Sequence, residues 1–356
     1  MSLKQRLIEQ ITWGGPISVA DYVHICLLDP KDGYYTHNVA FGEDGDFITA
    51  PMISQMFGEM IGVWVAQLWR GLGSPGRFRL VEIGGGDGTL MSDVVRVADK
   101  VPGLRKAAAI TFVEPARNLA IRQAKAVANS VFVDDLASLA TDMPMILVAN
   151  EVLDCLPARQ FVRTETGWHE RRVGLRDGEL VFGLSEAPGF APPPGETPLG
   201  EIVEISLAQA QFVQQLADIL AIASGAALLI DYGRSAPGTG DTLQAMHRHH
   251  RCDPLEAPGK HDLTMWADFP AIREMFVNTQ VKCSEITTQS VFLKGLGLED
   301  RLNSLRTQNR DQSAKLERQC NRLTATGEMG DLFKVVALAS PPGLALPGLE
   351  PAAAQD

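Results

Sequence analysis

Short apolar runs alternate with amphipathic stretches through most of the chain. The runs have the length of buried strands, and the stretches between them repeat apolar positions every three or four residues, as helices do. This alternation is typical of an α/β fold, in which a mostly parallel sheet carries helices on both faces. It predicts strands at 78–83, 108–113, 130–133, 145–149, 226–230 and 333–339, and helices at 89–99, 116–128 and 203–223.

The remaining segments have a different character. Apolar residues at helical spacing predict a helix from Ile53 to about Leu68, ahead of the first strand. Proline, glycine and polar residues dominate the other segments. We expect a loop at 187–198, irregular structure at 234–266, polar helices at 297–322 and a disordered tail at 341–356.

The composition is that of a folded, acidic protein. Of the residues, 45% are hydrophobic and 21% are charged, which excludes wholesale disorder. The length of 356 residues suggests about two domains. The net charge of -11 argues against DNA or RNA as the main partner. The five cysteines form no CxxC pair and no Cys/His cluster, so we expect neither a disulfide framework nor a metal site.

No targeting or membrane segment is recognisable. The first residues resemble neither a secretory signal nor a transit peptide, and the longest apolar run, 219–230, is too short to span a bilayer. The sequence therefore predicts a cytoplasmic protein without a transmembrane segment.

Two glycine-rich segments could bind a nucleotide-like cofactor. Gly71–Gly76 has GxGxxG spacing, but it follows a helix and precedes a strand, so it predicts a plain loop. Gly84–Gly88 follows a strand and precedes a helix. Because Thr89 replaces the third glycine of a dinucleotide fingerprint and no Gly-Lys-Ser/Thr follows, NAD, FAD and nucleoside triphosphates are disfavoured. The spacing is similar to the first motif of class I S-adenosylmethionine (SAM) methyltransferases, where glycines let the backbone approach the ligand: Gly84, Gly86 and Gly88.

Acidic residues occupy the positions at which such folds contact SAM. Glu82 lies on the strand before the glycines. Glu114 ends the next strand, where a carboxylate can accept hydrogen bonds from both ribose hydroxyls, although capping of the following helix is the alternative. The third strand is followed by Asp134, Asp135 and Leu136, where we expect the adenine.

Polar residues also follow the fourth strand, whose carboxyl end should face the transferred methyl group. A guanidinium stays charged near neutral pH, so an arginine acceptor needs carboxylates to hold it and to accept a proton. Glu151 and Asp154 would share one side of a helical turn and do this, with Asn150 orienting the cofactor or the acceptor. The alternative is that both acids cap the following turn.

Several segments follow one another along nearly the whole chain in the order of a single family. They are Gly15–Tyr22, Gly33–Tyr35, Gly45–Pro51, Ile53–Glu59, the glycine motif, Asn150–Pro157, Asp231–Gly233, Thr242–Ala245, Asp253–Leu255, Pro258–Gly259 with Asp262–Thr264, and Met329–Lys334. With these segments the sequence resembles the mitochondrial complex I assembly-factor methyltransferases and their bacterial MidA-type homologues, the former DUF185 family.

The resemblance implies a Rossmann-like class I methyltransferase sheet with a final antiparallel strand, an N-terminal helical cover and an inserted substrate-binding region. On this basis we assign a cover at 1–75, a SAM-binding core at 76–233, a substrate-binding insertion at 234–330, the final strand at 331–340 and a tail at 341–356. Residues 45–59 of the cover should fold over the cofactor, and the nearest are expected to be Thr49, Ser54 and Gln55.

The activity implied by the resemblance is symmetric dimethylation of a protein arginine on a core subunit of respiratory complex I. One departure concerns Asp87, which stands where the family usually has arginine and leaves the cation for the SAM carboxylate unassigned. Methyl transfer to another protein or to a small molecule, and a non-catalytic assembly factor of the same fold, are the alternatives. The oligomeric state stays open, with a homodimer among the possibilities.

Overall fold

The computed structural model describes residues 1–37, 49–192 and 195–349. The chain divides into two compact units, which we describe separately. The first unit takes Met1–Phe47, Leu153–Gln211 and Ala236–Asp268, and the second takes Ile48–Val152, Phe212–Ser235 and Phe269–Asp356. The segment 76–233, which we assigned to one core, is therefore divided, because residues 153–211 fold with the first unit.

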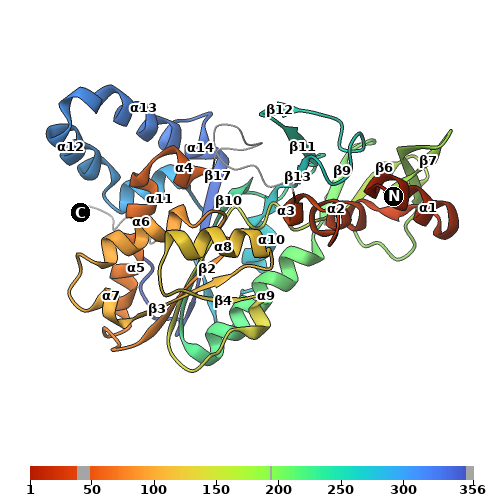
Figure 1. Ribbon diagram of the computed structural model, residues 1–356. Helices are drawn as coiled ribbons and strands as arrows, with labels where there is room; N and C mark the ends of the chain where they lie inside the picture. Colours follow the sequence, from red (N-terminus) through yellow and green to blue (C-terminus); the bar gives the residue numbers. More distant parts are fainter. Residues whose placement is uncertain (38–48, 193–194, 350–356) are drawn as a thin grey trace. The chain divides into compact units, whose positions relative to one another are not determined.

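The second unit is built on the predicted parallel sheet (Figure 1), in the order β15, β17, β10, β5, β2, β3 and β4. The parallel strands are β2 (Phe78–Ile83), β3 (Ala108–Val113), β4 (Val131–Val133), β5 (Met145–Asn150) and β10 (Gly225–Arg234). Strand β17 (Phe333–Ser340) runs antiparallel to β10, and its other edge pairs with β15 (Lys282–Cys283) and β16 (Thr287–Thr288). The α/β class and the final antiparallel strand are confirmed.

Helices cover both faces of this sheet, with α5 and α6 on one face and α9 and α10 along the other (Figure 1). Alternate residues of the strands are buried against α5, among them Phe112 and Ile146 beside the fully buried Trp64. The helices of this unit are α4 (Ala50–Ile53), α5 (Gln55–Gly71), α6 (Thr89–Ala98), α7 (Leu104–Ala107), α8 (Arg117–Ala126), η1 (Leu136–Ser138), α9 (Leu207–Ala223, which starts in the first unit), α10 (Phe269–Glu274), α11 (Gln289–Gly295), α12 (Leu298–Gln308), η2 (Arg310–Gln312), α13 (Ser313–Thr324) and α14 (Met329–Leu332).

The first unit is built on an antiparallel sheet that the hydrophobic pattern did not predict. Its strands are β1 (Ile17–Ser18), β7 (Gly167–Arg176), β6 (Arg159–Thr164) and β9 (Ile202–Ile205), in that order, with β8 (Glu179–Glu186) paired to β7. A second sheet joins β12 (His250–Arg251), β11 (Gln244–His247) and β13 (Asp262–Thr264), and β14 (Ala267–Asp268) is a short strand.

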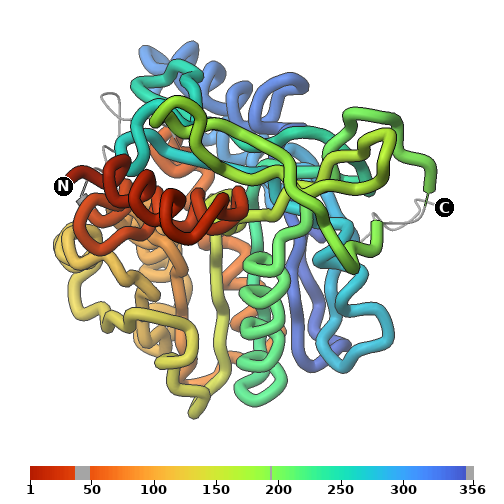
Figure 2. The backbone as a smooth tube through the Cα atoms, turned by 90° about the vertical axis from the view of Figure 1, so that its right-hand side faces the viewer, coloured from red at the N-terminus to blue at the C-terminus, as the bar shows by residue number. Residues whose placement is uncertain are grey.

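Helices from the start of the chain complete this unit: α1 (Leu3–Gly14), α2 (Val19–Leu28) and α3 (Tyr34–His37). Helices α1 and α2, red in Figure 2, pack on strands that follow more than a hundred residues later. The core includes Tyr22, which is fully buried and whose hydroxyl donates a hydrogen bond to the carbonyl oxygen of Pro254 at 2.6 Å.

Three local predictions are wrong. The helix expected at 203–223 starts only at Leu207, because Ile202–Ile205 pair with β6 as strand β9. The irregular segment 234–266 contains the second sheet. Residues 341–349 of the expected tail are ordered, because Leu344, Leu346 and Leu349 are buried in the core of the second unit. Residues 350–356 lie outside the described part of the chain.

Within the ranges that the structure describes, no helix combines the length and the apolar character that a membrane crossing requires.

Candidate cofactor and acceptor site

The glycine turn connects β2 to α6 in a conformation that requires glycine. The φ angles are +64° at Gly84, +53° at Gly86 and +87° at Gly88, in the left-handed region that other residues rarely adopt. A Cβ on Gly84 would lie 3.0 Å from Val152, and one on Gly88 would lie 2.9 Å from the Cβ of Ala126. The turn is therefore packed closely against its neighbours.

Glu82 brings an incompletely bonded carboxyl group to this turn. Its side chain is 3% exposed, and its Oε2 has no hydrogen-bond partner among the described residues. Burial raises the pKa of Glu82 well above its usual value, and Asp87 and Glu114 add to this, against the lowering effect of a hydrogen bond from the backbone of Met91. A buried oxygen without a partner is costly unless a ligand completes it. A ligand carrying an ammonium group, as SAM does, fits this position.

Glu114 lies at the end of β3 and is 5% exposed. Its Oε1 accepts a hydrogen bond from the backbone of Ala116 at 2.9 Å, and its Oε2 accepts one from Nε2 of Gln123 at 2.9 Å. Burial raises the pKa of Glu114, and the two hydrogen bonds oppose that rise. The capping alternative is thus realised at Ala116, the N-cap of α8, and it leaves the carboxylate able to accept further hydrogen bonds.

The residues after β4 are used in local structure. Asp135 caps η1 by accepting a hydrogen bond from the backbone of Ser138 at 2.8 Å, and hydrogen bonds from the side chain and then the backbone of Ser138 lower the pKa of Asp135. Asp134 is exposed, and Leu136 is buried with 6% exposure. The adenine contact of these three residues stays a prediction.

Asn150 and Glu151 lie at the carboxyl end of β5, the strand next to β2. Nδ2 of Asn150 donates to Oε1 of Glu151 at 2.9 Å, and the backbone of Ala50 donates to the same oxygen at 3.2 Å. Oδ1 of Asn150 is buried without a partner in the described ranges. Glu151 has a φ of +57°, a strained conformation that folds tend to retain at functional sites.

The expected helical turn after Glu151 is wrong, because residues 151–157 form bends and turns without a helix. Asp154 belongs to the first unit, whereas Glu151 belongs to the second. Asp154 is 6% exposed, and its Oδ1 accepts a hydrogen bond from Sγ of Cys155 at 3.2 Å. The two acids are therefore separate candidates for contact with an acceptor.

The residues expected from the cover have structural roles in the second unit. Thr49 is the N-cap residue of α4, but its side chain makes no capping hydrogen bond with the described residues. Oγ of Ser54 caps α5 by accepting a hydrogen bond from the backbone of Met56 at 3.2 Å. Ser54 and Gln55 line a cavity of about 340 Å³ together with Asn309, Gln312, Lys315 and Gln319 of the α12–α13 region. Their proximity to the cofactor stays a prediction, and residues 45–48 lie outside the described part of the chain.

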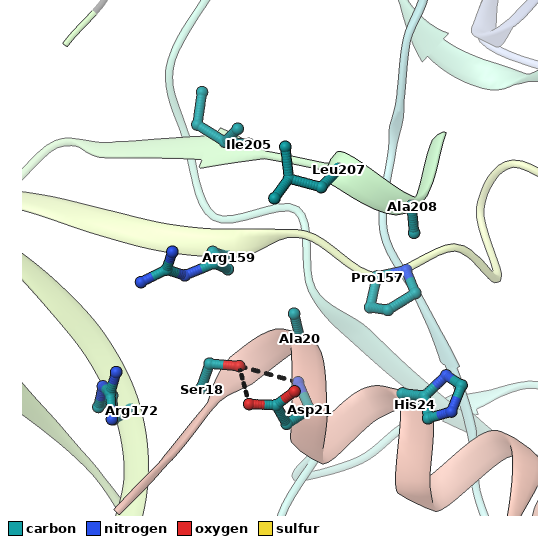
Figure 3. Close-up of a pocket in the computed structure, with 10 residues that line it drawn as sticks. All are labelled: Ser18, Ala20, Asp21, His24, Pro157, Arg159, Arg172, Ile205, Leu207 and Ala208. Carbon is teal, nitrogen blue, oxygen red and sulfur yellow. Dashed lines mark hydrogen bonds between the residues drawn. The ribbon is translucent and has the colours of Figure 1, made fainter. Parts of the chain in front are cut away.

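The first unit has a cavity of its own, of about 510 Å³ (Figure 3), where no predicted site residue lies. Glu170, which is 1% exposed, accepts hydrogen bonds from two residues of its wall, Arg159 at 2.7 Å and Arg172 at 2.8 Å. Burial alone would raise the pKa of Glu170, but the two guanidinium groups lower it. The guanidinium groups of Arg159 and Arg172 in the cavity wall are thus held by ion pairs with Glu170, and these pairs also stabilise the sheet that contains β6 and β7.

Gln123 was missed by the sequence analysis, although it contacts both Glu114 and the glycine turn. It lies in α8, whose only large apolar residues are Leu119 and Ile121, and it is fully buried. The spacing of Leu119 and Gln123, four residues apart on one helix face, was the available signal.

Comparisons with known proteins show the family of this chain. A family model described as "Putative S-adenosyl-L-methionine-dependent methyltransferase" matches residues 60–287. The chain is 35% identical to "Protein arginine methyltransferase NDUFAF7, mitochondrial" of Danio rerio, across 94% of this chain and 86% of that one. It is 34% identical to the Mus musculus protein of the same name, across 94% and 83% of the two chains.

A solved structure has the same fold throughout. A "likely methyl transferase" from Burkholderia thailandensis, bound to S-adenosyl-homocysteine, is 27% identical and has a TM-score of 0.81 over 98% of this chain and 93% of that one. The relatives also correct one prediction: their names place them in mitochondria, which contradicts the cytoplasmic location expected from the sequence. The chain belongs to the family of SAM-dependent methyltransferases that includes these relatives, and SAM is its methyl donor.

Proposed function

We propose that the protein methylates the guanidinium group of a protein arginine, that the acceptor is a core subunit of respiratory complex I, and that the product is symmetric dimethylarginine. The observation that carries the proposal is the carboxylate of Glu151 at the end of β5, held by Asn150 and the backbone of Ala50. The names of the relatives, which are protein arginine methyltransferases, support an arginine acceptor. The complex I subunit and the symmetric product rest on the family resemblance.

In this proposal the glycine turn, Glu82 and Glu114 bind SAM, with Asp134, Asp135 and Leu136 beside the adenine. SAM, when bound, supplies an electrophilic methyl group on its sulfonium. Glu151 holds the guanidinium and receives the proton that the attacking nitrogen releases as it bonds to the methyl carbon, while the sulfur–methyl bond breaks and S-adenosyl-homocysteine is the leaving group. Asn150 and Ala50 bind one oxygen of Glu151 and so fix the direction of its carboxylate. Asp154 is the second candidate for the guanidinium contact.

The test is methyl transfer from labelled SAM to a purified fragment of a complex I core subunit. Glu151→Gln preserves the shape of the side chain and removes its charge, so we expect unchanged affinity for S-adenosyl-homocysteine and loss of most turnover. Glu274→Gln, at an exposed acid that ends α10, is the matched control and should keep both. Asp154→Asn measures the contribution of the second acid.

Two results would overturn parts of the proposal. A label found by mass spectrometry on a residue other than arginine contradicts the acceptor class. Wild-type turnover by Glu151→Gln, with the label on arginine, contradicts the role of the carboxylate and leaves the acceptor class intact. Fragmentation of the labelled peptide distinguishes symmetric from asymmetric dimethylarginine.

A further inference from the structure

A buried glutamine links the glycine turn to the carboxylate that ends β3. Gln123 is fully buried, and its Nε2 donates to Oε2 of Glu114 at 2.9 Å and to the carbonyl oxygen of Gly86 at 3.0 Å. A side-chain amide nitrogen has two hydrogens, so both are used. Because both partners are acceptors, the orientation of the amide follows from them. Oε1 of Gln123 has no partner in the described part of the chain, so the donor side alone holds the amide.

The glycine turn allows this contact because it lacks a side chain where α8 crosses it. A Cβ on Gly88 would lie 2.9 Å from the Cβ of Ala126 and 3.1 Å from the Cα of Gln123. The backbone of α8 therefore packs directly on the turn, which brings the Gln123 amide within reach of Gly86 and Glu114. Gly88 thus supports the site through packing.

We infer that Gln123 is a positioning residue for SAM, which fixes the glycine turn and the Glu114 carboxylate in one arrangement. The inference rests on the proposed contact between Glu114 and the ribose. An ionised carboxylate can accept a hydrogen bond from each ribose hydroxyl, whereas a protonated one has lost part of that capacity. Gln123 favours the ionised form because it donates to it.

The charges around Glu114 come from several elements. The nearby acids are Glu82 on β2 and Asp87 in the glycine turn, and the charges of Asp87 and Glu114 both disfavour ionisation of Glu82. On α8 and after β4 the charged side chains are exposed to solvent: Arg117, Arg122, Lys125, Asp134 and Asp135. These groups are the same in the wild type and in variants of Gln123. A difference between the two proteins in how ligand affinity depends on pH therefore reports the loss of the amide.

The direction in which pH changes ligand affinity follows from the hydrogen bond between Gln123 and Glu114. Burial raises the pKa of Glu114, and the Gln123 amide opposes that rise. Affinity for the ligand should fall as the pH falls through the pKa of Glu114. Loss of the amide raises this pKa further, so the fall begins at a higher pH in the variant.

The experiment is calorimetric titration of the full chain with S-adenosyl-homocysteine at a series of pH values, from acidic to alkaline, over which circular dichroism shows the protein folded. We expect Gln123→Met to bind roughly tenfold more weakly at the acidic end of the series and to approach the wild type at the alkaline end. Gln289→Met is the matched control, because Gln289 is also fully buried, donates from Nε2 to Leu323 at 2.9 Å and has an Oε1 without a partner among the described residues. It should bind as the wild type does at every pH.

A second variant covers the case in which Gln123→Met does not fold. Gln123→Glu keeps the length of the side chain but can donate only while the introduced carboxyl is protonated, so its affinity relative to wild type should fall as the pH rises. A loss that is independent of pH in both variants, or one equal to that of Gln289→Met, would overturn the inference. Glu114→Gln separates the two levels: unchanged affinity in that variant would mean that Glu114 does not contact the ligand, and the proposed site itself would fail.

Discussion

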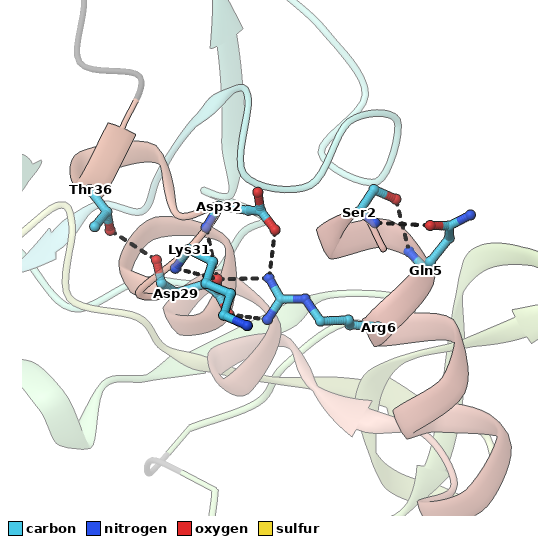
Figure 4. A network of polar contacts seen from close by, with 7 residues as sticks. All are labelled: Ser2, Gln5, Arg6, Asp29, Lys31, Asp32 and Thr36. Atoms are coloured by element: carbon cyan, nitrogen blue, oxygen red, sulfur yellow. Dashed lines mark hydrogen bonds and ion pairs between the residues drawn. The ribbon is translucent and has the colours of Figure 1, made fainter.

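Two acidic clusters of this protein handle charge in opposite ways. In the first unit, both carboxylate oxygens of Asp29 accept hydrogen bonds from Arg6 at 2.7 Å, and Oδ1 also accepts from the backbones of Lys31 and Asp32 at 2.9 Å (Figure 4). Hydrogen bonding to Arg6 holds the pKa of Asp29 far below its usual value. At the glycine turn of the second unit, burial instead raises the pKa values of Glu82 and Glu114.

The difference separates stability from binding. In the Arg6 cluster both carboxylate oxygens of Asp29 are bonded within the protein, although Nε of Arg6 has no partner in the described ranges, and the ion pair joins α1 to the end of α2 and favours the folded state. The glycine turn leaves a buried oxygen of Glu82 without a partner in the described ranges, at a cost to the free protein. Sites with such perturbed groups are frequently functional, because a ligand can supply the missing interactions. The comparison predicts that substitutions in the two clusters change different properties.

The largest effect is expected at Gly86. Gly86→Val should abolish detectable binding of S-adenosyl-homocysteine, because a β-branched residue is strained at a φ of +53°. Its side chain would also fill the space in which the protein backbone is expected to contact the ligand. Calorimetric titration measures the binding, and circular dichroism checks the fold. Gly76→Val is the matched control, since a Cβ there would meet no atom of the described residues within 4 Å. Near-wild-type affinity of Gly86→Val would remove the glycine turn from the site.

Glu114→Ala should weaken SAM binding by roughly 1.5–3 kcal/mol, the range for a lost charge-assisted hydrogen bond. Equilibrium dialysis with labelled SAM gives the affinity. Glu274→Ala, at an exposed acid, serves as the control and should leave the affinity unchanged. Unchanged binding by Glu114→Ala would move the ribose contact to another residue.

In the first unit the expected change is in stability. Asp29→Asn should lower the free energy of unfolding by about 1–2 kcal/mol at neutral pH, because it removes the charge that Arg6 binds at both oxygens. Since the folded pKa of Asp29 is lowered, its contribution is present above the unfolded value of about 4 and is lost as the pH falls through the folded value. The difference between wild type and variant should therefore shrink below about pH 4.

Urea denaturation at several pH values measures this difference. The matched control is Glu179→Gln, which breaks the exposed Lys4–Glu179 ion pair of 2.7 Å in the same unit and should cost less than about 0.5 kcal/mol. An equal loss in the two variants would show that the Arg6 cluster is no more stabilising than a surface ion pair.

The same two regions differ in how far the sequence predicts them. Strands β2 and β3 match their predicted bounds, because each is mostly apolar and buried and is bounded by a clear end, Gly84 after β2 and Glu114 after β3. The hairpins of β6, β7 and β8 were missed, since arginine and glutamate interrupt their apolar residues. Asp177-Gly178, both at positive φ between β7 and β8, was the turn signal that could have revealed them.

The residues of the site could be only partly predicted from the sequence, for a related reason. Glu82, Glu114 and the glycines stand next to strand ends, so strand prediction locates them. The bonds of Gln123 depend on how closely α8 packs on the glycine turn, which no local pattern encodes. The positive φ of Glu151 likewise arises where β5 ends in irregular backbone.

The smallest predicted effect tests whether the glycine turn pays a stability cost for binding. The pKa of Glu82 is raised by burial, so its ionised form disfavours folding above the unfolded value of about 4.3. Glu82→Gln removes that charge and should raise the free energy of unfolding of the free protein by about 1 kcal/mol at neutral pH, while weakening affinity for S-adenosyl-homocysteine. The gain should vanish as the pH falls toward the unfolded value, the opposite of the profile at Asp29.

Glu59→Gln is the matched control for Glu82→Gln, because Glu59 is a buried acid of the same unit that is paired. It is 4% exposed, and its carboxylate accepts two hydrogen bonds from Arg301, at 2.7 and 2.8 Å. Its substitution should destabilise the protein, since Arg301 would lose its partner. Urea denaturation of both variants decides the matter: destabilisation by Glu82→Gln at neutral pH, comparable to that of Glu59→Gln, would show that Glu82 is bonded as a structural residue and that the contrast between the two clusters is wrong.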